Sequence, residues 1–408
     1  MIDIRELRHD PEPYLARLRR KGAEELGREL LAADAAWREA TTEVETLRAG
    51  QKPQGKPTPE QLEELRQRKE RLQAAEARLA EAEAARSALL IRVPNPPADD
   101  VPDGGEDDFE VIREVGERPS FDFTVRDHLD LGTEHGWIDQ ERGAKVSGSR
   151  FVYRLGELAL LELALYRYAL DRVVRHGHVP MLPPVLVREE AMYGTGFFPT
   201  EQVNIYGVER DELYLVGTSE VPAAAFHGGE FLDEEALPLR YAAYSVCFRR
   251  EAGAAGKDTR GMFRVHQFDK VEMFVYCRPE DSAAEHERLL AIEEEIVQGL
   301  GLPYRVINVA AGDLGAPAVK KYDIEAWFPG QERYREITST SNTTDYQARR
   351  LDVRFRRDGK PEHVHTLNGT AVTARSLIAI VENFQDEGGA VAVPPALQEL
   401  GAPAKLGA

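Results

Sequence analysis

The segment from Phe248 to Glu272 combines arginine, glycine and aromatic side chains in a way that suits an anionic ligand. A predicted strand ends in Arg249, a glycine-rich loop follows, and the chain returns as a second predicted strand that carries Arg264 and Glu272. A guanidinium presents a planar set of donors that matches phosphate oxygens, and Phe268 offers a face for an aromatic base. Taken alone, however, the segment is more simply explained as a surface hairpin with several arginines.

Three other sets of polar residues could bind small ligands at the ends of predicted elements. One set pairs a carboxylate with a hydroxyl three residues later, and Mg²⁺ prefers such hard oxygen ligands. A second set follows a short predicted strand, and a third precedes an apolar helix whose amino-terminal end would favour an anion. The sets are Glu336-Ile337-Thr338-Ser339, Thr218-Ser219-Glu220, and Asn368-Gly369-Thr370 with Arg375. Each set alone is better explained as a polar loop or a helix cap.

The elements around these residues predict an antiparallel sheet. Apolar residues alternate along 322–328 and again along 351–355, which is typical of half-buried strands. Asp358-Gly359 favours a tight hairpin turn that returns through 363–367. The sequence contains neither a Gly-x-Gly-x-x-Gly nor a Gly-x-x-x-x-Gly-Lys-Ser/Thr motif, so a Rossmann or P-loop cradle for a nucleotide is excluded.

Residues 26–47 and 60–90 have a different character, because they lack proline and are rich in Ala, Glu, Leu and Arg. Leu65, Leu72 and Leu79 recur every seven residues, as they do at the seam of a coiled coil. The glycine- and proline-rich segment between the two stretches cannot remain helical. Two helices with matching seams and such a breaker between them predict an antiparallel hairpin.

The tip of this hairpin is its most distinctive part. Thr58 followed by Pro59 predicts the start of the second helix, with Thr58 as its N-cap. Arg48, Lys52 and Lys56 are the charged residues of the connecting segment, which contains no carboxylate. A dimerisation or spacer coiled coil explains the hairpin about equally well, but a basic tip on an acidic chain is a candidate contact for phosphates.

The chain of 408 residues carries 52 Lys+Arg against 71 Asp+Glu, a net charge of −19. This balance excludes a basic coat for nucleic acid over the whole protein, and two cysteines exclude a disulfide scaffold or a thiolate zinc site. No apolar run approaches a membrane span, and the N-terminus lacks a signal-peptide core. We expect a cytoplasmic α+β protein in which an acidic, proline-rich linker over 92–120 joins two domains, 1–110 and 111–408.

Together these segments resemble the bacterial-type seryl-tRNA synthetases, which are class II aminoacyl-tRNA synthetases, over nearly the whole chain. The hairpin is similar to the family's tRNA-binding arm. His178–Pro184 resembles the first class II motif, a dimer-interface element, while 248–272 and 368–385 resemble the second and third. The resemblance implies an N-terminal helical-arm domain and a C-terminal catalytic domain built on an antiparallel sheet flanked by helices.

The resemblance also implies roles for individual residues. Those implied to be catalytic are Arg249, Glu336 and Arg375. Those implied to bind serine are Thr218, Ser219, Glu220, Arg249, Glu272, Asn368 and Thr370. Those implied to bind ATP are Arg249, Arg250, Glu251, Val265, Phe268, Glu336, Ile337, Thr338, Ser339 and Arg375. Mg²⁺ would be held by Glu336 and Ser339, and tRNA would be contacted by Arg48, Lys52 and Lys56.

In such an enzyme the serine carboxylate attacks the α-phosphorus of ATP, and the seryl group then passes to the 3′-terminal ribose of tRNA. No protein general base is required, so His266 is expected to be structural. The implied partners are L-serine, tRNA(Ser), tRNA(Sec) as a second substrate, and a second copy of the chain whose arm reaches tRNA bound at the other subunit. The alternative is a synthetase-like paralogue that regulates or loads another carrier, and serine-dependent exchange of pyrophosphate into ATP would distinguish the two.

Overall fold

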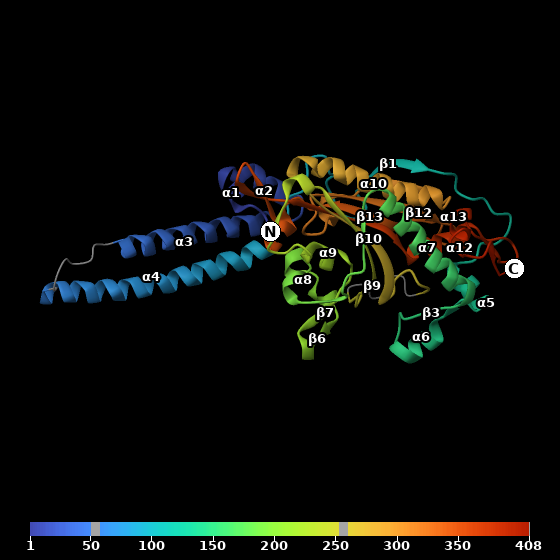
Figure 1. The fold of residues 1–408 in the computed structure, drawn as a ribbon, viewed down its shortest axis with the longest axis horizontal. Coiled ribbons are helices and arrows are strands. Elements are labelled where there is room, and N and C mark those ends of the chain that lie inside the picture. The colour runs from blue at the N-terminus through green and yellow to red at the C-terminus, as the bar shows by residue number, and fades with distance from the viewer. Residues whose placement is uncertain (50–57, 253–259, 408) are drawn as a thin grey trace. The chain divides into compact units, whose positions relative to one another are not determined.

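The structure, a computed structural model, describes residues 1–49, 58–252 and 260–407. Contacts within the chain divide it into two compact units, Met1–Pro96 and Pro97–Ala408. The described helices of the first unit are α1 (Ile4–His9), α2 (Pro11–Arg19), α3 (Glu24–Ala49) and α4 (Pro59–Arg92). The two long helices cover the predicted ranges 26–47 and 60–90 and lie side by side (Figure 1).

Helices α3 and α4 run antiparallel, which confirms the predicted hairpin. Arg86 pairs with Asp34 at 2.8 Å and Arg78 pairs with Glu43 at 2.7 Å, so the end of α4 lies opposite the beginning of α3. The heptad positions form the seam between the helices, where Ala75 is fully buried. A small residue at this position lets the two backbones approach closely.

Two local features determine where these helices begin and how closely they pack. The Thr58 hydroxyl accepts from the Gln61 N–H (3.3 Å), and the Gln61 side chain accepts from the Thr58 N–H (2.9 Å). This capping box confirms the predicted start of α4 and satisfies two amides that have no partner within the helix. At Gly27, an added Cβ would lie 2.7 Å from Leu15 and Leu18, so glycine is needed where α3 crosses α2.

Asp34 generates a prediction about the stability of the first unit. Its side chain is 1% exposed and contacts Arg86 of α4 at 2.8 Å and Arg8 of α1 at 3.3 Å. We expect Asp34→Ala to lower the free energy of unfolding of this unit by about 3 kcal/mol, because it leaves two guanidinium groups without their shared carboxylate. Denaturant unfolding followed by far-ultraviolet circular dichroism would measure the loss.

The matched control is Arg28→Ala, which removes an exposed ion pair with Glu24 (2.9 Å) on the same helix. Exposed pairs contribute little, so this variant should lose less than about 0.5 kcal/mol. Equal losses in the two variants would contradict the importance of the buried carboxylate.

The second unit is built around an eight-stranded sheet in which all neighbours are antiparallel except β9 and β4 at one edge. The antiparallel sheet expected from the sequence is therefore confirmed. In spatial order its strands are β1 (Glu110–Val115), β11 (Tyr304–Asn308), β12 (Lys320–Phe328), β13 (Arg333–Asn342), β16 (His365–Thr373), β10 (Gln267–Cys277), β9 (Leu239–Phe248) and β4 (Val179–Met181).

The two faces of this sheet differ in chemistry. On β10, Val271, Met273 and Val275 enter the main hydrophobic core, whereas Lys270 and Glu272 line a cavity, as expected for side chains that alternate along a strand. The apolar face packs on α7 (Gly156–Arg175), α10 (Ser282–Gly299) and α12 (Ala374–Asn383). The apolar helix expected next to Arg375 corresponds to α12.

Shorter elements surround this framework. The helices are α5 (His128–Glu134), α6 (Gln140–Ser147), α8 (Glu189–Thr195), α9 (Glu220–Ala225), α11 (Tyr346–Leu351) and α13 (Pro395–Gln398). The strands are β2 (Ile138–Asp139), β3 (Tyr153–Arg154), β5 (Leu186–Val187), β6 (Gly207–Val208), β7 (Leu213–Leu215), β8 (Phe231–Leu232), β14 (Arg354–Arg357), β15 (Lys360–His363), β17 (Val391–Ala392) and β18 (Lys405–Leu406). Within the described ranges, no helix has an apolar stretch that could serve as a bilayer span.

Two strand predictions need correction. The hairpin turn at Asp358-Gly359 is confirmed, with φ of 50° and 76°, but Leu351 ends helix α11, and its strand begins only at Arg354. Asp352 takes a left-handed φ of 55° and so stops the helix. Arg264 precedes β10, which begins only at Gln267, because the N–H of the intervening His266 donates to the Arg150 carbonyl at 3.1 Å and not to a strand.

Part of the segment expected to form a linker is hydrogen-bonded to the rest of the second unit. The Ala98 N–H donates to the Val319 carbonyl, and the Ala311 N–H donates to the Pro102 carbonyl, both at 2.9 Å. Val101 is 4% exposed in a small apolar cluster. By its contacts the chain therefore divides at Pro96, and 97–110, assigned above to the N-terminal domain, belongs with the second unit.

Candidate active site

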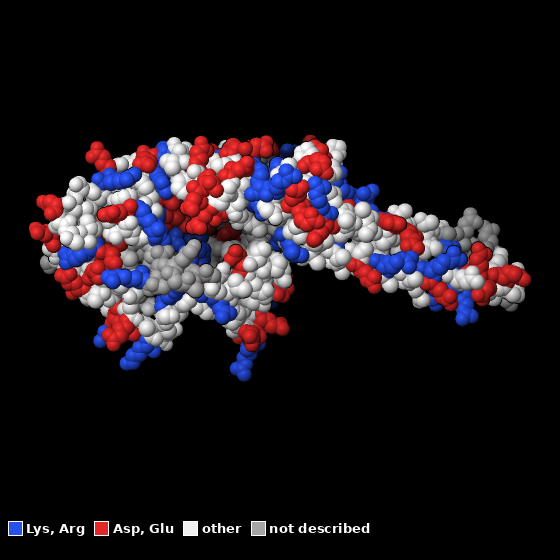
Figure 2. Space-filling view, turned by 180° about the vertical axis from the view of Figure 1, so that it is seen from behind, with Lys and Arg blue, Asp and Glu red and all other residues white. Residues whose placement is uncertain are grey.

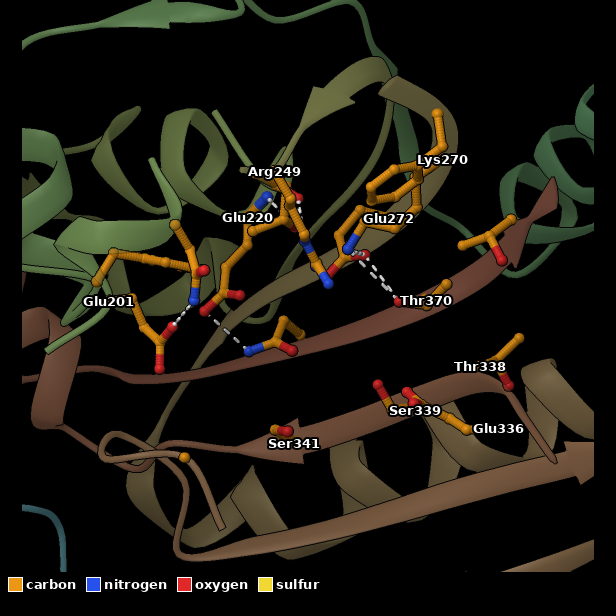
Figure 3. A pocket seen from close by; sticks show the side chains of 18 of the residues that line it. Glu201, Glu220, Arg249, Lys270, Glu272, Glu336, Thr338, Ser339, Ser341 and Thr370 are labelled. Carbon is orange, nitrogen blue, oxygen red and sulfur yellow. Dashed lines mark hydrogen bonds and ion pairs between the residues drawn. The ribbon is translucent and has the colours of Figure 1, made fainter. Parts of the chain in front are cut away.

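A cavity of about 570 Å³ opens on the polar face of the eight-stranded sheet. Most of the residues selected from the sequence line it, although they come from five separate segments. They are Thr218, Glu220, Arg249, Glu251, Val265, Phe268, Glu272, Glu336, Ile337, Thr338, Ser339, Asn368, Thr370 and Arg375. Figure 3 shows how the side chains of Glu220, Arg249 and Glu272 converge across the strands from Glu336 and Ser339.

Arg249 lies just past the end of β9, where it faces the cavity. Its Nε donates to the Gly217 carbonyl at 3.1 Å, and its guanidinium carbon lies 5.2 Å from the centre of the Phe268 ring. These contacts orient the side chain through Nε and the flat face of the guanidinium. No described residue accepts from its two terminal nitrogens, so both can donate to an anion in the cavity.

Lys270, Glu272 and Thr370 form a polar cluster on β10 and β16. The Lys270 ammonium contacts the Glu272 carboxylate, and both side chains are almost completely buried. The Thr370 hydroxyl donates to Glu272 at 3.2 Å. Thr370 stands opposite Glu272 because Ala371 is an extra residue of β16 at an irregularity in the pairing with β10. Ala371 is fully buried in the apolar core.

Glu220 begins α9 and points into the same part of the cavity. Its Oε1 accepts from Gln347 Nε2 (2.7 Å) and from Asn368 Nδ2 (3.1 Å). Burial, and next the charge of Glu272, raise the pKa of Glu220 to about 7. This carboxyl therefore changes charge near neutral pH, and a cation placed beside it would favour its ionised form.

Glu336 and Ser339 share the cavity face of β13 even though they are three residues apart. Strict alternation would place them on opposite faces, but the pairing with β12 slips at Ile337, because Glu325 faces Glu336 whereas Ile324 faces Thr338. A β-bulge of this kind re-aims side chains. It explains why a carboxylate and a hydroxyl at this spacing lie together (Figure 3).

Two cations accompany Glu336. Arg375 Nη1, from the first turn of α12, donates to Glu336 Oε2 at 3.0 Å, and Lys321 of β12 lines the same cavity. Burial acts to raise the pKa of Glu336, but the charges of Lys321 and Arg375 outweigh it and hold this pKa below its usual range. The carboxylate is thus ionised at neutral pH and is suited to a cation.

Glu251 is held in an unusual backbone conformation at the cavity rim. Its φ is 51°, in the left-handed region that a residue with a Cβ rarely adopts. The carboxylate pairs with Arg264 at 2.7 Å. The neighbouring amides of Arg250 and Ala252 donate to the backbone and side-chain oxygens of Asn204, at 2.8 and 3.1 Å.

Some selected residues lie outside the cavity lining. Ser219 is fully buried, and its hydroxyl donates to the Ala243 carbonyl at 3.3 Å. Arg250 is exposed, with its guanidinium 5.9 Å from the Tyr206 ring centre. His266 Nδ1 lies 2.8 Å from the Arg249 carbonyl and does not line the cavity, which agrees with a structural role.

The basic tip differs from the expectation in one respect. Arg48 pairs with Glu76 of α4 at 2.8 Å, so its charge is compensated within the hairpin. The sequence suggested otherwise because Glu76 lies outside the connecting segment. Lys52 and Lys56, like residues 253–259 of the glycine-rich loop, lie outside the described residues.

Sequence analysis missed several polar residues of the site. Lys270 could have been identified, because Phe268, Lys270 and Glu272 alternate on one face of a predicted strand. Lys321 and Gln347 gave no such signal. Lys321 pairs with Asp323 of the same strand at 2.9 Å, and its charge acts on Glu336 of β13, whereas Gln347 reaches Glu220 from another helix.

Comparisons with known proteins agree with this geometry. Residues 1–97 match the model of the seryl-tRNA synthetase N-terminal domain, and residues 205–384 match that of the class II tRNA synthetase core domain (G, H, P, S and T). A serine–tRNA ligase of Thermobifida fusca is 53% identical over 409 residues, which cover 98% of this chain and 97% of that protein.

Solved structures extend the agreement to the fold. A seryl-tRNA synthetase from Pyrococcus horikoshii complexed with ATP superposes with a TM-score of 0.94 at 41% identity, covering 100% of this chain and 99% of that one. A cytoplasmic serine–tRNA ligase from Naegleria fowleri in complex with AMP gives a TM-score of 0.88 at 34% identity, covering 97% and 95%. This chain therefore belongs to the seryl-tRNA synthetases, the ligases that use ATP to join serine to tRNA.

Proposed function

We propose that the cavity on the sheet is where serine and ATP react, with the two substrates side by side. The observation that carries this proposal is the convergence of Arg249, Glu272, Glu336 and Arg375 from four elements on one cavity. Anion-binding and cation-binding groups alternate across it, as the zwitterion of an amino acid and the phosphates of a nucleotide require.

Serine would lie over β10 and β16. Its ammonium group would face the carboxylates of Glu220 and Glu272, and its carboxylate would face Arg249. The hydroxyl of serine would contact Thr370 and Glu272, which are 3.2 Å apart, with Thr218 and Asn368 completing the pocket. A pocket that bonds the hydroxyl would reject alanine strongly, because alanine leaves these polar groups without partners.

ATP would extend from the serine pocket toward β13. Phe268 and Arg375 would bracket the adenine, and Glu251 and Val265 would contact its edge. A serine carboxylate oxygen attacks the α-phosphorus, the bond to the bridging oxygen breaks, and pyrophosphate leaves with that electron pair. Arg249 and Arg375 would stabilise the charge that develops on the phosphate oxygens. A ribose hydroxyl of tRNA then attacks the seryl carbonyl, and AMP leaves.

The donors on β13 fit a divalent cation such as Mg²⁺. Glu336 is ionised, and Ser339 adds a hydroxyl on the same face, so two hard oxygen ligands are available. Among the described residues, no group of three or more His, Cys, Asp or Glu side chains could hold a metal by itself. The phosphates of ATP would therefore complete the coordination, and the cation would withdraw charge from them.

Glu336→Ala should reduce serine-dependent exchange of pyrophosphate into ATP by about 100-fold or more, because a preorganised charge at the phosphates is lost. Its response to Mg²⁺ concentration should also weaken. Glu325→Ala is the matched control. This carboxylate faces Glu336 in the strand register but pairs with Arg305 at 2.5 Å and does not line the cavity. Comparable losses in both variants would argue against Glu336 as the metal ligand.

We propose that the α3–α4 hairpin contacts tRNA, both tRNA(Ser) and tRNA(Sec), in the cytoplasm. The surface carries interspersed acidic and basic side chains (Figure 2), and the net charge of −19 opposes a polyanion. Local positive groups must therefore provide the attraction. Lys52 and Lys56 would provide it at the tip, and Arg48 would contribute less because Glu76 already compensates it.

Replacing residues 38–82 by a short Gly/Ser bridge should separate the two half-reactions. This deletion removes the outer part of the hairpin and keeps the Asp34–Arg86 pair at its base. Serine-dependent pyrophosphate exchange should stay within about threefold, whereas charging of tRNA should fall by orders of magnitude. The milder Lys52→Glu/Lys56→Glu variant should weaken tRNA binding and flatten its dependence on salt. Unchanged charging by the deletion variant would refute the role of the hairpin.

We also propose that the chain forms a homodimer, with the arm of one subunit reaching tRNA at the other. Large apolar side chains are exposed next to the edge strand β4: Leu163 of α7 is 63% exposed and Leu182 is 82% exposed. Apolar exposure of this kind marks an interface. Leu163→Asp/Leu182→Asp should sediment as a monomer, whereas Leu62→Asp, at a 54% exposed leucine of α4, should not. If both variants sedimented as monomers, or both as dimers, the proposed interface would be wrong.

A further inference from the structure

A fully buried amide, Gln347 of α11, links the cavity to the polar layer behind it. Its Nε2 donates to Glu220 Oε1 at 2.7 Å and to the Thr195 carbonyl at 3.3 Å. Its Oε1 accepts from the Thr366 hydroxyl at 2.9 Å. A glutamine amide has two N–H donors, and both are used here on acceptors from two different helices.

The acceptors around Gln347 determine which way its amide points. The Thr195 carbonyl can only accept, so the amide atom of Gln347 that lies 3.3 Å from it is the nitrogen. The oxygen Oε1 then faces the Thr366 hydroxyl, which can donate either to it at 2.9 Å or to the Thr343 hydroxyl at 2.6 Å. With Oε1 turned toward Thr366, the amide nitrogen must face Glu220. A flipped amide would set two acceptors against each other.

The consequence for Glu220 is an unequal use of its two oxygens. Both amide donors, from Gln347 and Asn368, reach Oε1. Among the described residues, none donates to Oε2. Since Glu220 lines the cavity, Oε2 is the oxygen that is left for a ligand there.

We infer that Gln347 is a positioning residue for serine: it saturates one oxygen of Glu220 and so directs the other oxygen toward the serine ammonium group. Gln347 does not line the cavity and does not touch the substrate. The inference rests on the proposed function, in which Glu220 receives that ammonium group.

Charged groups on β10 and just past the end of β9 act on Glu220. Burial and the charge of Glu272 raise its pKa to about 7, while the hydrogen bond from Gln347 and the charges of Lys270 and Arg249 lower it. On α11 itself, the Arg350 guanidinium donates away from Glu220, to the Tyr193 carbonyl at 2.8 Å. Because serine would bind the ionised carboxylate, its affinity should fall as the pH drops through the pKa of Glu220.

The test follows the Michaelis constants for serine and ATP in pyrophosphate exchange between pH 5.5 and 8.5, using full-length protein. Gln347→Met keeps the volume of the side chain but removes its donors. The acid limb, the rise of the serine constant toward low pH, should therefore move upward by about one pH unit, and the serine constant should rise about fivefold at pH 7. Gln347→Glu places a second acid beside Glu220 and should shift the limb further. The ATP constant should stay within about twofold in both.

Two controls separate positioning from general destabilisation. Thr366→Val removes a hydroxyl that lies 2.9 Å from the amide oxygen and should shift the acid limb in the same direction by a smaller amount, so it tests the inference even if a Gln347 variant does not fold. Asn308→Leu removes another buried amide, which donates to the Asp100 carbonyl at 2.9 Å outside the cavity. It should lower the melting temperature and leave the acid limb unchanged.

The outcomes distinguish this inference from the proposed function. Glu220→Gln should abolish the acid limb and raise the serine constant, and if it does neither, the serine-binding role of Glu220 is wrong. If Glu220→Gln behaves as expected but the Gln347 and Thr366 variants leave the limb in place, only the positioning role is refuted. A parallel rise of the serine and ATP constants would also refute it, because it would indicate a general loosening of the core.

Discussion

The site depends on the compensation of charge that the sheet has largely removed from water. Glu220, Glu272 and Glu336 share one cavity, and a carboxylate as deeply buried as Glu272 would cost several kcal/mol without a partner. Each has a different kind of partner. Glu272 contacts an ammonium, Glu336 a guanidinium and Glu220 two neutral amides. The neighbouring cations lower the pKa of Glu336, whereas burial and the charge of Glu272 raise that of Glu220, so Glu336 is ionised at neutral pH and Glu220 changes charge near pH 7.

Two irregularities in the ladder determine which side chains take part in this compensation. The extra residue Ile337 in β13 brings Glu336 and Ser339 to one face, and the extra residue Ala371 in β16 sets Thr370 opposite Glu272. In a regular strand a shift of one residue moves a side chain to the other face of the sheet. The same polar residues in regular strands would lie partly in the apolar core under α7, α10 and α12.

Much of the architecture could be predicted from local patterns. The heptads of α3 and α4, the Thr58 capping box and the Asp358-Gly359 turn depend on residues close in the sequence, and all three are present. The sheet-lining residues could be selected because they lie in segments that resemble a known family. The bulges could not be predicted, because an extra residue is visible only against its partner strand.

Interactions between distant elements account for the remaining differences. Arg48 was expected to carry an uncompensated charge, but it pairs with Glu76, which lies 28 residues further along the chain. The acidic segment after α4 was expected to be a linker, and neither its composition nor its prolines indicate that Val319 and Ala311 bind its backbone. Gln347 looks like an ordinary polar residue of a helix until Glu220 and Thr366 are brought to it.

The two units of the chain are stabilised by different sets of interactions. The contacts of the helix seam, and those of Asp34 near the beginning of α3, lie within Met1–Pro96. The cavity carboxylates and their cations lie within Pro97–Ala408. Substitutions at such separate sites have nearly additive effects. The compensation of buried charge therefore constrains the cavity alone, and the hairpin is constrained by its own seam. Because the whole chain is acidic, any attraction to a polyanion must come from local groups of basic side chains, not from the net charge.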